Sequence, residues 1–221
     1  MALTVHVAPA SAFTGDEIRV WREIPTSIVG DELNRGQIMQ AAIKPVAPGR
    51  SFAGPAITVR CMVGDNLALH HALTCARPGD ILVVDARGHE DTAVWGEILH
   101  TAARQCGIAG IVIDGATRDV GALRGSDLPV YVRAVVPSGP HKGFGGEINA
   151  PVQCGGVPVA PADLIIGDDD GVVVVRPYQL AGLLQRCQNR LRREAELLAQ
   201  VRAGVSTVEL LGLPAPEETV D

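Results

Sequence analysis

Short runs of aliphatic and β-branched residues alternate with longer amphipathic stretches through the first two thirds of this chain, and this alternation constrains its fold more than any other feature. Four runs have the length and composition of strands: residues 51–63, 80–86, 109–115 and 129–135. Between them, residues 65–76 and 91–107 carry apolar side chains at helical spacing, and a short helix is predicted to begin near Arg118. Strands that alternate with helices predict an α/β domain with substantial parallel pairing.

The last third of the chain has a different character. Residues 152–160, 162–168 and 171–177 are short β runs joined by Gly, Pro and Asp, which predicts hairpins rather than crossovers. The acidic stretch Asp168–Gly171 lacks the spaced ligands of a calcium loop and is predicted to be a turn. Beyond it, a polar helix is expected from about Tyr178 to Ala203.

We expect the 221 residues to form a single domain, since 47% of them are hydrophobic and supply a sizeable core. Residues 1–50 are predicted to be a helical lead-in, because apolar residues between positions 16 and 42 recur at loosely helical spacing. Residues 51–176 are the predicted α/β core, and residues 177–221 the predicted C-terminal helix and tail.

Charge and cysteine content exclude several classes of function. The net charge is −6, and the only lysines are Lys44 and Lys142, which argues against a surface that tracks nucleic-acid phosphates. The five cysteines lie far apart and show no metal-ligand spacing, so we interpret them as reduced thiols. No apolar run has the length of a signal peptide or a membrane span. We therefore expect a soluble, cytoplasmic protein that binds neither nucleic acid nor membranes.

Arg118 and Asp119 follow a predicted buried strand, at the sheet edge where open α/β proteins usually bind ligands. Standing alone, the pair would be interpreted as a salt bridge or a helix cap rather than as a ligand site. However, Gly96 and Glu97 are predicted to lie in the first turn of a helix whose start faces the same edge. The helix N-terminus would bind the carboxylate of an α-keto acid, Arg118 its keto oxygen, and Asp119 a magnesium ion.

These residues lie in segments that resemble the RraA-like family, which includes the 4-hydroxy-4-methyl-2-oxoglutarate / 4-carboxy-4-hydroxy-2-oxoadipate aldolases. The resemblance covers roughly residues 24–212. Its most specific motif is an acidic residue, twenty intervening residues and then Arg-Asp, here Glu97 and Arg118-Asp119. It implies a swivelling α/β/β fold, similar to phosphohistidine domains, in a homotrimer or homohexamer with sites at subunit interfaces.

The resemblance also implies a lyase, a class II pyruvate aldolase of aromatic-compound degradation with oxaloacetate decarboxylase side activity. In the family's aldolases, an acidic residue at the position of Glu97 orients a water for proton transfer. An arginine at the position of Arg118 contacts the keto acid, and an aspartate at the position of Asp119 ligates Mg²⁺ or Mn²⁺. The implied substrate-binding residues are Gly96, Glu97, Ile98, Leu99 and Arg118. No Schiff-base lysine is required, and neither lysine of this chain is predicted to be buried.

The match has departures and leaves alternatives. The aldolases usually carry Asp in place of Glu97 and often an acidic residue in place of Ala122. A glutamate from a neighbouring subunit's C-terminal region approaches their site, a role open here to Glu194 or Glu196. Family members that lack the Arg-Asp pair resemble non-catalytic regulators that bind ribonuclease E, so regulation remains the alternative function.

Two further features are interpreted as peripheral. His70 and His71 fall on different faces of one predicted helix, which favours a surface or interface role over metal binding. The glycine-rich stretch 139–147 lacks the strand and helix of a nucleotide-phosphate cradle. We expect it to be a loop at the mouth of the site, with Lys142 or Arg133 available to a second substrate carboxylate.

Overall fold

The computed structural model describes residues 2–11 and 13–217, and over these residues it is an α/β/β domain. The central strands are β3 (Phe52–Cys61), β4 (Ile81–Trp95), β5 (Gly110–Thr117) and β6 (Val130–Val135). Each pairs in parallel with the next. The predicted parallel α/β core is therefore confirmed.

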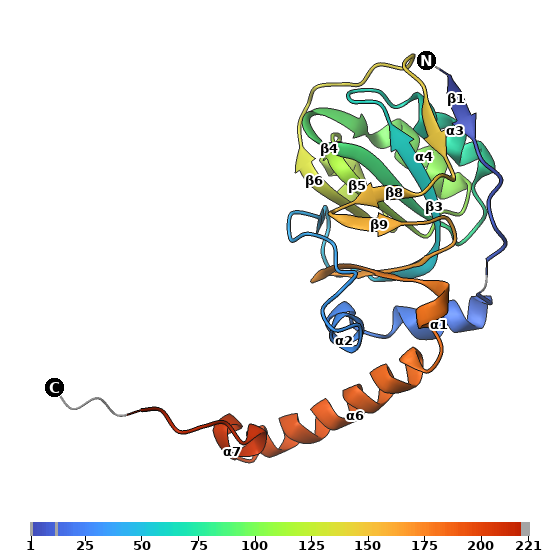
Figure 1. Cartoon of the computed structure of the whole chain (residues 1–221). Coiled ribbons are helices and arrows are strands. Elements are labelled where there is room, and N and C mark those ends of the chain that lie inside the picture. The colour runs from blue at the N-terminus through green and yellow to red at the C-terminus, as the bar shows by residue number, and fades with distance from the viewer. Residues whose placement is uncertain (1, 12, 218–221) are drawn as a thin grey trace.

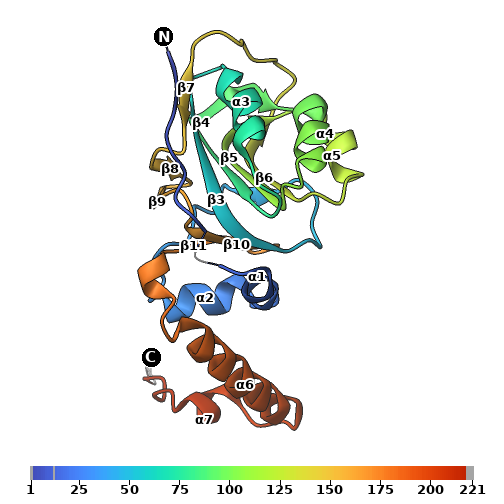
Figure 2. The same ribbon diagram turned by 90° about the vertical axis from the view of Figure 1, so that its right-hand side faces the viewer.

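Helices cover one face of this sheet and a hairpin covers the other (Figure 2). The helices are α3 (Leu67–Cys75), α4 (Glu97–Gln105) and α5 (Val120–Arg124). The hairpin consists of β8 (Val152–Cys154) and β9 (Val157–Val159). A core cluster on the helical side contains Leu69 and Trp95, and one on the hairpin side contains Val112 and Tyr131. Side chains that alternate along the strands fill both layers.

A second hairpin, β10 (Leu164–Asp168) and β11 (Gly171–Val175), extends the sheet from the first half of β3. This confirms that the acidic stretch 168–171 is a turn. Asp169 accepts hydrogen bonds from the amide of Gly49, and Asp168 from the amide and hydroxyl of Thr26. These carboxylates fasten the N-terminal segment to the sheet.

The N-terminal helices pack against this second hairpin. They are α1 (Gly15–Arg22), which Thr14 and Glu17 cap reciprocally, and α2 (Thr26–Glu32). Trp21 and Ile28 bury their side chains there with Val173. The lead-in is not only helical, because β1 (Leu3–Val5) pairs in parallel with β7 (Gly146–Ile148), and β2 (Lys44–Pro45) pairs with β6.

The C-terminal segment leaves the domain as an arm. After a 3-10 turn at Pro177–Gln179, α6 (Leu183–Arg202) extends away from the sheet, and α7 (Thr207–Leu211) lies at its far end (Figure 1). The helix begins five residues later than predicted because Gly182, in a left-handed conformation, precedes it. Of the helices that the structure describes, none has the length and apolar character needed to cross a membrane.

One predicted helix was partly wrong. Residues 91–95 continue strand β4, and α4 starts only at Glu97. The strand reaches this length because its pairing with β5 shifts register at irregularities near Arg87 and Gly88, both of which have positive φ. These local irregularities allow the chain to rejoin β5 at its carboxyl end.

Candidate active site

The ends of β4 and β5 bring two sequence segments together. Trp95 pairs with Thr117 at the last position of the two strands. The amide of Arg118 then donates a 3.0 Å hydrogen bond to the carbonyl of Trp95. As a result, Gly96 and Glu97 lie beside Arg118 and Asp119, as expected from parallel strands that end at one edge.

Asp119 is held in an unusual backbone conformation. It is left-handed, with φ 58° and ψ 37°, at the start of α5. Its Oδ2 accepts a 3.0 Å hydrogen bond from the amide of Glu97 and lies 3.5 Å from Nε of Arg118. Aspartate is one of the residues that most readily adopts this conformation, and here the conformation directs the carboxylate toward α4. The backbone amide of Glu97 therefore ties the Asp119 carboxylate to the start of α4.

Gly96 has no room for a side chain. A Cβ at this position would lie 2.6 Å from Oδ2 of Asp119 and 3.2 Å from Cγ of Arg118. Its backbone is extended, with φ −173°, so the requirement for glycine comes from the close approach and not from the backbone angle. The helix start and the Arg-Asp pair are thus in direct contact.

The N-terminus of α4 provides backbone donors next to this contact. The first hydrogen bond along the helix is donated by His100 to the carbonyl of Gly96. The amides of Ile98 and Leu99 precede it and have no helical acceptor. Free amides and the helix dipole favour an anion, so a carboxylate fits here.

A cavity adjoins these groups, and its lining adds polar residues from other elements. Asn66 and His70 come from the start and middle of α3, and Lys142 comes from the loop that follows β6. Arg118 and Asp119 line the same cavity. Desolvation, and then the charge of Lys142, lower the pKa of His70 below its ordinary value.

The loop that carries Lys142 is fastened by a buried carboxylate. Asp65, fully buried, accepts hydrogen bonds from the amides of Leu67, Gly143 and Phe144. The loop crosses the end of the sheet near α3 (Figure 2). There the backbone amide of Asn66 donates a hydrogen bond to the carbonyl of His141, which belongs to the loop. One aspartate therefore connects α3 to the loop at the mouth of the cavity.

Comparison with known proteins agrees with this architecture. The model of the RraA-like family, described as Aldolase/RraA, matches residues 26–174. The chain belongs to the RraA-like family. It is 39% identical over 188 residues, 85% of this chain and 88% of the other, to a Halalkalibacterium halodurans protein named "Putative 4-hydroxy-4-methyl-2-oxoglutarate aldolase".

Solved structures of this RraA-like family are also similar. The RNA-processing inhibitor RraA from Thermus thermophilis has a TM-score of 0.64 and 30% identity, covering 69% of this chain and 93% of that one. Streptomyces coelicolor RraAS2, described as an unusual member of the RNase ES inhibitor RraA protein family, has a TM-score of 0.74 and 26% identity, covering 87% and 99%. The RraA-like fold predicted from the sequence is confirmed.

The donor set of this RraA-like protein suits a hard cation at one position. Among the described residues, no three His, Cys, Asp or Glu side chains form a cluster that could hold a metal ion. Magnesium, however, needs only one or two protein carboxylates when water and substrate oxygens complete its shell. Asp119, a partly exposed carboxylate beside the cavity, fits that requirement.

Other predicted candidates of the RraA-like chain lie elsewhere or face solvent. The side chain of Arg133 is engaged by Asp114 at 2.6 Å and does not line the cavity. Glu194 pairs with Arg190 on the α6 arm, and Glu196 is exposed on the same arm. Within one copy of the chain, the structure therefore does not bring either glutamate to Asp119.

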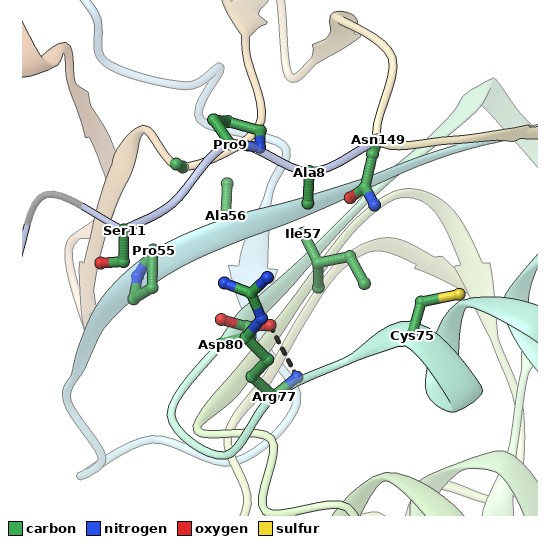
Figure 3. A pocket seen from close by; sticks show the side chains of 11 residues that line it. Ala8, Pro9, Ser11, Pro55, Ala56, Ile57, Cys75, Arg77, Asp80 and Asn149 are labelled. Atoms are coloured by element: carbon green, nitrogen blue, oxygen red, sulfur yellow. Dashed lines mark hydrogen bonds between the residues drawn. The ribbon is translucent and has the colours of Figure 1, made fainter. Parts of the chain in front are cut away.

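A second cavity lies near the start of β4, and Figure 3 shows the side chains that line it. Its walls include Asp80, just before β4, and Arg77, whose amide donates a 2.8 Å hydrogen bond to the Asp80 carboxylate. Its volume of about 30 Å³ suits one or two water molecules. The cavity beside Arg118 has a volume of about 60 Å³, and of these two cavities it is the one that adjoins the free amides at the start of α4.

Proposed function

We propose that this RraA-like protein is a divalent-metal-dependent aldolase. Its substrate is a 4-hydroxy-2-oxo di- or tricarboxylic acid, such as 4-hydroxy-4-methyl-2-oxoglutarate or 4-carboxy-4-hydroxy-2-oxoadipate, and its products are pyruvate and a second keto acid. The observation that carries this proposal is the contact of Arg118 and Asp119 with Gly96 at the N-terminus of α4. It combines a cation, a hard anionic ligand and free amides beside one cavity.

In this reaction the amides of Ile98 and Leu99 hold the carboxylate of the pyruvyl half. Arg118 binds its keto oxygen, so the guanidinium stabilises negative charge that develops there as the carbon–carbon bond breaks. A divalent cation held by Asp119 would supply further positive charge for the same purpose. The electron pair of the broken bond passes to the pyruvyl half, which becomes the pyruvate enolate. The carbon that carried the hydroxyl group becomes the carbonyl carbon of the second keto acid.

Proton transfer falls to Glu97. Its exposed side chain is available to orient a water that accepts the hydroxyl proton and then returns a proton to the enolate carbon. Loss of carbon dioxide from oxaloacetate generates the same enolate, so decarboxylation of oxaloacetate is expected as a secondary activity. The longer reach of Glu97 compared with an aspartate places the carboxylate one methylene further out.

The alternative function is regulation of an RNA-processing nuclease such as ribonuclease E. It is supported by the RraA inhibitors to which the chain is structurally similar. The Arg-Asp pair favours the enzyme, because the family members that resemble non-catalytic regulators lack it. We also propose that the protein is cytoplasmic and assembles as a homotrimer or homohexamer.

The test is pyruvate release coupled to lactate dehydrogenase, with Mg²⁺ or Mn²⁺ and with EDTA. The wild type should cleave the 4-hydroxy acids only with metal, and Arg118→Ala and Asp119→Ala should lose at least about a hundredfold in kcat/KM. Arg104→Ala is the matched control, since Arg104 pairs with Asp127 at the other end of α4. Metal-independent binding of the nuclease, unchanged in Asp119→Ala, together with no pyruvate release would establish the regulator instead.

A further inference from the structure

Unpaired polar atoms are concentrated in the walls of the candidate active site. Among the described residues, seven buried side-chain nitrogens and oxygens have no hydrogen-bond partner. Three of them, Asn66 Oδ1, His70 Nε2 and Trp95 Nε1, belong to residues that line the cavity beside Arg118. Each unpaired buried group costs about 1–3 kcal/mol, and native structures contain few of them. All three residues line the same cavity, so a ligand that enters it and reorients these side chains would supply the missing partners.

His70 is separate from the groups that hold the pyruvyl half. Arg118, Asp119 and the α4 amides all come from the ends of β4 and β5, whereas His70 is on α3. Lys142, from the loop that Asp65 anchors, lines the same cavity, and its charge acts on the imidazole of His70. The two residues add a second polar wall to the cavity.

The chemistry of this wall suits an anionic oxygen. The lowered pKa keeps the imidazole neutral near pH 7, so one ring nitrogen donates a hydrogen bond while Lys142 supplies the positive charge. A neutral donor beside an ammonium group matches a carboxylate better than a hydrophobic tail. His71, the next residue, is exposed on another face of α3 and does not line the cavity.

We propose that His70 is a substrate-specificity residue, which binds through Nε2 the carboxylate of the substrate half that leaves as the second keto acid. The inference rests on the proposed aldolase function and deepens it. His70 distinguishes a long dicarboxylic substrate from pyruvate itself, which occupies only the Arg118 side of the cavity.

The experiment compares two reactions in His70→Ala, His70→Gln and the control His71→Ala. The first is cleavage of 4-carboxy-4-hydroxy-2-oxoadipate, measured as pyruvate release. The second is exchange of the pyruvate methyl protons for deuterium, followed by NMR in D₂O with Mg²⁺, which uses the pyruvyl half alone. Thermal unfolding of each variant checks that the fold is intact.

We expect His70→Ala to lower kcat/KM for cleavage about tenfold or more, mainly through KM, while pyruvate exchange stays within about twofold of wild type. The side-chain amide of His70→Gln should restore part of the lost kcat/KM, and His71→Ala should match wild type in both reactions. Equal losses in both reactions, or no loss in either, would overturn the assignment of His70. A wild-type protein inactive in both reactions would refute the aldolase proposal and this inference with it.

Discussion

Substitution of Gly96 by alanine should disable the candidate site without unfolding the protein. The added Cβ would lie 2.6 Å from Oδ2 of Asp119, whereas ordinary contact begins at 3.4 Å. The carboxylate must therefore move by about 0.8 Å, because the backbone of both segments is fixed by the paired strands. That movement breaks or lengthens the 3.0 Å hydrogen bond from the Glu97 amide.

The size of the effect follows from the same displacement. A misplacement of about 1 Å in a catalytic group costs roughly a hundredfold in rate, so kcat/KM for pyruvate release should fall by about that factor. Stability should change by only about 1 kcal/mol, because the lost hydrogen bond joins a partly exposed carboxylate. The variant should thus be folded and nearly inactive.

The control is Gly121→Ala in α5, two residues beyond Asp119. A Cβ there meets no atom within 4 Å, so activity should match wild type. The assays are metal-dependent pyruvate release and denaturation in urea. Full activity in Gly96→Ala would refute the argument that this close approach positions the Asp119 carboxylate, and so would an equal loss in Gly121→Ala.

Two further predictions concern buried groups. Asp65→Asn replaces an acceptor of three amide hydrogen bonds by a group with one acceptor oxygen. It should lower the free energy of unfolding, measured in urea, by about 2 kcal/mol, and proteolysis of the loop at Gly143 should become faster. Unchanged stability would contradict the anchoring role of Asp65. The pKa of His100 is held below its ordinary 6.5, first by desolvation and then by Arg104. Because the unfolded chain binds that proton more tightly, the stability present above pH 6.5 is lost as the pH falls through the lowered pKa. His100→Gln should therefore lose less stability than wild type between about pH 7.5 and pH 5 in urea unfolding, and parallel losses would contradict this.

The sequence was sufficient to predict the parts of the fold that depend on local pattern. Alternating strands and helices predicted the parallel core, and Asp-Gly at a β run predicted the turn between β10 and β11. The approach of Gly96 to Asp119 also followed from the order of strands and helices along the chain, because the end of a parallel strand and the start of the preceding helix meet at one edge of the sheet.

Features that depend on tertiary contacts were not predicted. The helix prediction for residues 91–95 failed because β4 stays paired with β5 across its irregularities, and pairing overrides the local helical spacing. Likewise, the sequence favours a surface or interface role for His70, since the absence of a partner for Nε2 is visible only once α3 is packed. Unsatisfied hydrogen-bonding capacity leaves no signal in sequence periodicity.

Strand β3 has a consequence for the order in which the chain can fold during synthesis. Its second half pairs with residues 81–85 and 146–148, and its first half pairs with residues 164–167. Since translation proceeds at roughly 5–20 residues per second, the first half waits several seconds for its antiparallel partner. A nascent chain stalled before residue 164 would present an unpaired apolar strand edge, so this is the stage at which the protein should depend most on chaperones.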